Sequence, residues 1–92
     1  VIAAIVLLCC YAFRISRTEL LFVLLSISMV ITCELINTAI EKAVDTATQE
    51  YNPTAKIAKD VAAGAVLFSA LNAAAVGIIV FGPKLLSLVF LL

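Results

Sequence analysis

Two long apolar runs, residues 20–40 and 61–82, limit the fold more than any other feature, because Glu34 is the only charged residue in either of them. As α-helices both runs are roughly 30 Å long, which matches the hydrocarbon thickness of a bilayer. The composition agrees: 65% of the residues are hydrophobic and 13% are charged, whereas soluble domains are about half apolar and about a quarter charged. We therefore predict an all-α integral membrane protein.

A further apolar block at residues 1–13 is only about 20 Å long as a helix, which is too short to cross a bilayer. We interpret the chain as a fragment whose upstream residues complete this span. The expected organisation is a single membrane domain over residues 1–92 with three transmembrane helices, at about 1–13, 20–40 and 55–82.

Breakers and polar residues predict where these helices end. Helix-compatible residues follow the second apolar run, so that helix should extend into water to about residue 50. Pro53 suits the first turn of the third helix, and Gly82-Pro83 is typical of a helix stop. The apolar residues 85–92 would then extend the helix or lie along the membrane surface.

Charge and cysteine usage argue against several functional classes. The six basic residues are scattered and the net charge is zero, so no basic stripe indicates nucleic acid binding. The three cysteines lie in apolar runs and the chain has no histidine, so we expect them to pack as small hydrophobes rather than to bind a metal. Basic residues divide evenly between the two loop sides, so the positive-inside rule leaves the orientation undecided.

One face of the second helix carries an unusual polar stripe. With Glu34 at zero on a helical wheel, Asn37, Glu41 and Asp45 fall at about −60°, −20° and +20°. Burying even one such acid in the membrane costs roughly several kcal/mol unless its charge is paired. The stripe therefore indicates a bound cation or a proton in transit, and the readiest candidate is Mg²⁺ with phosphates completing its shell.

Lys59 and Asp60 precede the third apolar run and should lie at the level of Glu41 and Asp45 if the hairpin is tight. A lysine there can pair with the acids or contact a phosphate. The small residues 62–65 allow close helix approach or leave room for a lipid headgroup. Interfacial charges also commonly extend to headgroups and form surface salt bridges; that explanation is weakest for Glu34, whose neighbours are membrane-compatible.

The pattern E-x-x-N-[ST]-A-[IL]-E-x-x-V-D is matched without a gap at residues 34–45 and resembles the signature of the prokaryotic diacylglycerol kinases and their undecaprenol kinase relatives. The resemblance implies three transmembrane helices per subunit after an amphipathic surface helix, in a homotrimer with shared active sites. It also implies a bacterial inner (plasma) membrane location with the sites facing the cytoplasm. The family's surface helix and a further metal-binding glutamate have no counterpart in this sequence.

Carried over residue by residue, the resemblance assigns the stripe to catalysis. Glu34 resembles the general base at the lipid hydroxyl, and Asn37 resembles a neighbour that orients the acids. Glu41 resembles a Mg²⁺ ligand that also contacts ATP, and Asp45 has a supporting role. Ala63 would lie beside the lipid substrate.

The resemblance assigns the remaining polar residues to the nucleotide. Lys59 and Asp60 resemble ATP contacts, with Lys59 on the phosphates. Glu50, Tyr51 and Asn52 would complete the ATP site, although Asn52 replaces a histidine that is common there.

The resulting hypothesis is an ATP-dependent membrane lipid kinase that phosphorylates undecaprenol or diacylglycerol. Residues 61–67 and Gly82-Pro83-Lys84 are more similar to the Gram-positive branch, which favours undecaprenol. Two alternatives stay open: a non-catalytic scaffold or degenerate family member, which would tolerate neutralisation of Glu34, and a small proton or ion carrier, which would show flux in liposomes without ATP.

Overall fold

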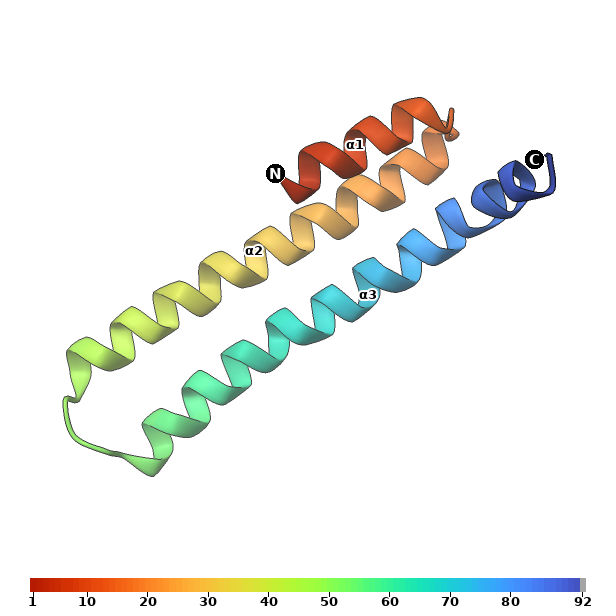
Figure 1. The fold of residues 1–92 in the computed structure, drawn as a ribbon. Coiled ribbons are helices and arrows are strands. Elements are labelled where there is room, and N and C mark those ends of the chain that lie inside the picture. The colour runs from red at the N-terminus through yellow and green to blue at the C-terminus, as the bar shows by residue number, and fades with distance from the viewer. Residues whose placement is uncertain (92) are drawn as a thin grey trace.

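The computed structural model describes residues 1–91, and these form three helices: α1 (Ile2–Ala12), α2 (Arg17–Ala47) and α3 (Pro53–Leu91). Helices α2 and α3 run antiparallel as a long hairpin, and α1 lies along the N-terminal half of α2 (Figure 1). The molecule measures 59 × 20 × 19 Å. The all-α prediction is therefore confirmed.

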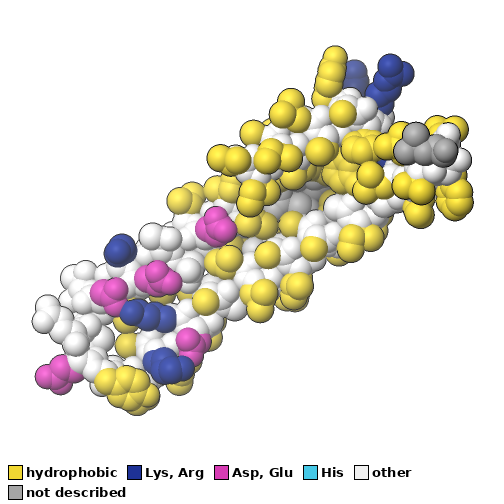
Figure 2. Space-filling view, in the orientation of Figure 1, with side chains coloured by type: hydrophobic (Ala, Val, Ile, Leu, Met, Phe, Trp, Pro, Cys, Tyr) yellow, Lys and Arg dark blue, Asp and Glu magenta, His cyan; other side chains and the backbone are white. Residues whose placement is uncertain are grey.

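The two long helices have the length and composition of membrane-crossing segments. In the most apolar window of α2 only 11% of the residues are buried, and in that of α3 only 6%, which distinguishes them from the core helices of a soluble protein. On the face shown in Figure 2, hydrophobic side chains predominate towards the end of the hairpin opposite the turn, whereas most acidic side chains gather near the α2–α3 turn. This distribution is that of a membrane protein.

A capping box starts α2 between the first two apolar runs. The backbone N–H of Glu19 donates to Ser16 Oγ, and the backbone N–H of Ser16 donates to Glu19 Oε1, both at 3.1 Å. These bonds satisfy two donors that a helix N-terminus otherwise leaves free. The S-x-x-E spacing at 16–19 was the available signal for this start.

The α2–α3 turn is short, and local contacts define the end of α2 and the start of α3. Helix α2 ends at Ala47, before the expected position 50, and Thr48 adopts extended geometry. Asn52 Oδ1 accepts the backbone N–H of Thr54 at 2.9 Å and that of Ala55 at 3.3 Å, so it caps α3.

The expected helix stop at Gly82-Pro83 is wrong, because α3 continues through Pro83 to Leu91. Proline removes a single backbone N–H, and an apolar helix tolerates that loss when it bends and neighbouring groups compensate. The ribbon of α3 changes direction near this point (Figure 1). Lys84 then reaches α2, where its Nζ donates to both carboxylate oxygens of Glu19, at 3.1 and 3.2 Å.

The apolar core lies towards the termini and away from the α2–α3 turn. Cys10, Val23 and Val80 are buried together, one from each helix. Cys10 thus packs as a small hydrophobe, as expected. In the other half of the hairpin a hydrogen bond from Lys59 to Asp45 joins α3 to α2, and the candidate site lies there.

Candidate active site

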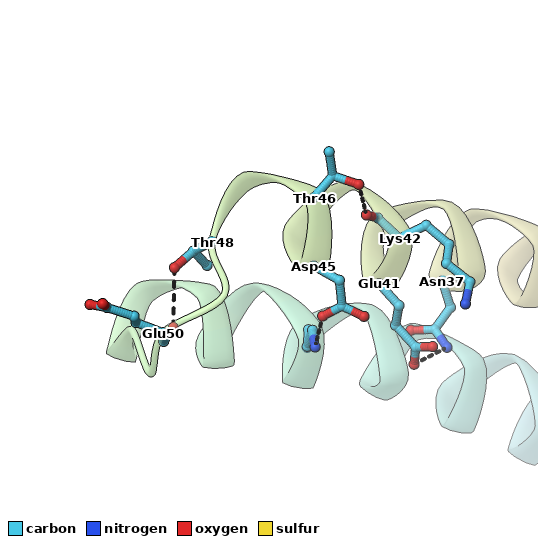
Figure 3. A network of polar contacts seen from close by, with 8 residues as sticks. Asn37, Glu41, Lys42, Asp45, Thr46, Thr48 and Glu50 are labelled. Atoms are coloured by element: carbon cyan, nitrogen blue, oxygen red, sulfur yellow. Dashed lines mark hydrogen bonds and ion pairs between the residues drawn. The ribbon is translucent and has the colours of Figure 1, made fainter.

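The polar stripe of α2 faces α3. Asn37, Glu41 and Asp45 project from α2 towards α3, whereas Thr46 points away (Figure 3). The residues recur at intervals of three and four, which places them on one face of the helix. The stripe that the sequence predicted therefore exists as a surface between the two long helices.

Asn37 and Glu41 form the first contact along this stripe. Asn37 Nδ2 donates to Glu41 Oε1 at 3.3 Å, one helical turn away. Asn37 Oδ1 is buried and has no partner, and it is the one side-chain atom in this condition among the described residues. A buried unpaired carbonyl costs about 1–3 kcal/mol, so this oxygen is a free acceptor for an incoming donor.

Asp45 and Lys59 connect the two helices. Lys59 Nζ donates to Asp45 Oδ1 at 2.5 Å, from α3 to α2. This hydrogen bond, with desolvation opposing it, holds the pKa of the Asp45 carboxyl below its ordinary value. Lys59 therefore lies at the level of the acids, as expected, and its ammonium is engaged by one of them.

Asp60 contacts a residue that the sequence did not suggest. Its carboxylate accepts from Lys56 Nζ at 2.8 Å, one turn earlier on α3. That hydrogen bond raises the pKa of Lys56. Both side chains are more than 60% exposed, and such surface pairs are weak, so Asp60 is readily released to another partner.

A polar hollow lies between the α2 C-terminus and the start of α3. Its volume is about 410 Å³, within the range of about 300–1,000 Å³ that small-molecule sites occupy. Five residues assigned to ATP or to support line it, together with Gln49 and Lys56, which sequence reasoning missed; these five are Asp45, Glu50, Tyr51, Asn52 and Lys59. Glu41 and Asp60, also expected at ATP, are not among its lining residues.

An apolar groove of about 630 Å³ lies along the other half of the hairpin. Glu34 is the only charged side chain among its lining residues, which come from all three helices: Val1, Ile2, Ala3, Val6, Val23, Ser26, Ile27, Val30, Ile31, Glu34, Ala70, Ala73, Val76, Gly77 and Phe81. Glu34 therefore belongs to the apolar groove, whereas Asp45 belongs to the polar hollow. About 16 Å of helix separates the two residues. Ala63 lines neither cavity.

The acids of the stripe are spaced along the helix rather than gathered. Within residues 1–91, no three metal-binding side chains come together as a candidate site. Mg²⁺ commonly takes one or two carboxylates and completes its shell with phosphates and water. Glu41, whose second carboxylate oxygen makes no hydrogen bond among the described contacts, is suited to that partial role.

Comparisons with known proteins identify related sequences. The family model described as "Prokaryotic diacylglycerol kinase" matches residues 1–81. A relative named undecaprenol kinase, from Bacillus subtilis, is 42% identical over 83 residues, which are 90% of this chain and 68% of that protein. A relative named diacylglycerol kinase, from Synechocystis sp., is 54% identical over 61 residues, which are 65% of this chain and 35% of that protein.

No solved structure matches the chain. The family model covers nearly the whole sequence, including the polar stripe, Lys59 and Asp60. The chain therefore belongs to the prokaryotic diacylglycerol kinase family, a family of lipid kinases.

Proposed function

We propose that this protein transfers the γ-phosphoryl group of ATP to the hydroxyl of a membrane lipid alcohol, undecaprenol or diacylglycerol. The observation that carries the proposal is the placement of one polar stripe between two unlike cavities. Glu34 lines the apolar groove at one end of the stripe, and Asp45 lines the polar hollow at the other. A greasy alcohol and a charged nucleotide can therefore approach the same face of α2.

In this proposal Glu34 is the general base. It accepts the proton of the lipid hydroxyl as the hydroxyl oxygen attacks the γ-phosphorus of ATP. The new O–P bond forms while the bond from the γ-phosphorus to the bridging oxygen breaks, so ADP leaves and the lipid phosphate remains. Positioning and charge neutralisation carry most of the catalysis in such transfers.

Lys59 neutralises phosphate charge in this scheme. Its ammonium is paired with Asp45 across the hairpin, so it exchanges a carboxylate oxygen for phosphate oxygens when ATP binds. Glu50, Tyr51 and Asn52, which line the same polar hollow, contact the rest of the nucleotide. Asp60 reaches the nucleotide after leaving Lys56.

Glu41 would hold Mg²⁺, and Asn37 fixes the orientation of the Glu41 carboxylate by its hydrogen bond. A metal held there would supply positive charge to the phosphate oxygens. Asn37 Oδ1, buried and unpaired, accepts a hydrogen bond from a group that arrives with the substrates. Ala63 lies beside the lipid headgroup.

The working unit in this proposal is a homotrimer in the bacterial inner membrane. Asn72 is exposed midway along α3, and an amide at that depth needs a hydrogen-bonding partner, which a second copy can supply. The polar hollow faces the cytoplasm, because that compartment contains ATP. Undecaprenol is the favoured acceptor, because the relative named undecaprenol kinase matches a greater share of this chain, and of its own length, than the relative named diacylglycerol kinase does.

A lipid phosphorylation assay on the full-length protein in membranes tests the proposal. Glu34→Gln and Glu41→Gln should each abolish phosphate transfer to undecaprenol and to diacylglycerol, with assembly unchanged on crosslinking. Glu19→Gln is the matched control at the far end of the hairpin and should retain turnover. Unchanged turnover in Glu34→Gln or Glu41→Gln defeats the role given to that residue.

A further inference from the structure

The walls of the apolar groove differ in kind. Helix α2 contributes mostly branched side chains, whereas α3 contributes Val76, Phe81 and three of the smallest residues: Ala70, Ala73 and Gly77. Their spacing of three and four residues places them on one face of α3. The free volume of the groove therefore depends on the absence of larger side chains at these three positions.

Gly77 gives an independent measure of that free volume. A Cβ built at Gly77 would meet no heavy atom within 4 Å. No close approach of another backbone thus requires glycine there. The space beside Gly77 is part of the groove, and a side chain introduced at that position would extend into it.

We propose that Ala73 and Gly77 set the width of the apolar groove for the hydrocarbon chain of the acceptor lipid, and so decide which lipid alcohols present their hydroxyl to Glu34. This inference rests on the proposed function and adds to it the residues that select the substrate. The occupant is the isoprenoid chain of undecaprenol, the acceptor that the proposed function favours.

The position of Glu34 supports this occupant. The apolar groove extends from Glu34 to Val23 along α2, which is about 16 Å of helix. That distance is about half of the hydrocarbon core, so the groove holds the part of the chain next to the hydroxyl while the remainder lies in the bilayer. With Glu34 as the only charge, the lining suits hydrocarbon along the rest of its length.

The test compares substitutions inside and outside the groove. Ala73→Leu and Gly77→Leu narrow it, and Ala75→Leu makes the same Ala-to-Leu change about 200° around the helix. Initial rates are measured on the full-length protein in mixed micelles with undecaprenol, with dioleoylglycerol and with dimethylallyl alcohol, a short acceptor. Helix content and assembly are checked for each variant.

Ala73→Leu and Gly77→Leu should raise KM for the long-chain acceptors at least about tenfold, because pocket discrimination on this scale follows from even one methylene. KM for ATP, turnover of dimethylallyl alcohol and all constants of Ala75→Leu should stay unchanged. The rise should be larger for undecaprenol, and a rise in KM for dioleoylglycerol alone overturns the assignment of the isoprenoid chain to the groove. If the Ala73→Leu protein does not assemble, Gly77→Leu, which fills open space, gives the result.

A measurement that needs no turnover separates this inference from the proposed function. An undecaprenol analogue with a photoactivatable diazirine in its chain should label residues that line the groove, such as Val76 and Phe81, in the wild type and in Ala75→Leu, and label them much less in Ala73→Leu. A wild type that phosphorylates no acceptor refutes the proposed function alone. Unchanged KM in both groove variants, an equal rise in Ala75→Leu, or labelling outside the groove overturns the inference.

Discussion

Asn37 gives the sharpest test of the site, because its two amide atoms have opposite energetic effects. Its Nδ2 donates to Glu41 at 3.3 Å, whereas its Oδ1 is buried without a partner. Asn37→Leu keeps a similar shape and removes both. The loss of a hydrogen bond to a charged group costs about 1.5–3 kcal/mol, and the removal of an unpaired buried carbonyl returns about 1–3 kcal/mol.

The two effects nearly cancel in stability but not in catalysis. We expect the thermal midpoint of Asn37→Leu in detergent to stay at or above that of the wild type. Turnover at saturating ATP and lipid should fall at least about tenfold, because about 1.4 kcal/mol of lost orientation at Glu41 corresponds to that factor. Because the Asn37–Glu41 distance of 3.3 Å is long for a hydrogen bond, we expect the energy lost with it to lie near the lower end of the range of about 1.5–3 kcal/mol.

The assay measures initial rates of lipid phosphorylation and thermal unfolding on the same preparations. Thr38→Val is the matched control: it also replaces a polar residue, one position further along α2, and its hydroxyl donates only to the backbone oxygen of Glu34. It should keep wild-type turnover. Full turnover in Asn37→Leu, or a fall in turnover matched by an equal fall in stability, would refute the orienting role.

Three further predictions concern other contacts. Lys59→Met should raise KM for ATP at least about tenfold, in line with the loss of a charge-assisted phosphate contact, whereas Lys42→Met on the same hairpin should not; equal effects would contradict the assignment. Because the folded pKa of Asp45 lies below 3.8, its pairing with Lys59 should stabilise the wild type over Lys59→Met above about pH 3.8, and the difference should disappear as the pH falls through the folded pKa; an acid titration of unfolding measures this. Ser16→Ala should lower stability by about 1 kcal/mol through loss of the α2 cap and leave both KM values unchanged, and a change in kinetics without a change in stability would count against it.

The sequence by itself determined the features that depend on local periodicity and on the solvent around each segment. Apolar runs of spanning length predicted the membrane helices, and the spacing of Glu34, Asn37, Glu41 and Asp45 predicted their shared face. Residues three and four apart lie together on any α-helix, whatever packs against it. The family pattern at 34–45 lies within this single helix and was therefore readable without a structure.

Contacts between helices were decided only by the tertiary structure. The pairing of Lys59 with Asp45 rather than Glu41, and that of Lys84 with Glu19, depend on the register of α3 against α2. That register follows from the turn before Pro53 and from packing of Val23 against Val80, neither of which periodicity specifies.

The two cavities, and the course of α3 beyond Pro83, have the same origin. The polar hollow lies at the turn, away from the buried core, whereas the apolar groove runs beside that core and shares Val23 with it; both depend on how α3 packs on α2. Pro83 read alone indicates a stop, but α3 bends and continues beside α2, where Lys84 meets Glu19. Local sequence specifies which residues share a face; only the packing of one helix on another determines what that face meets.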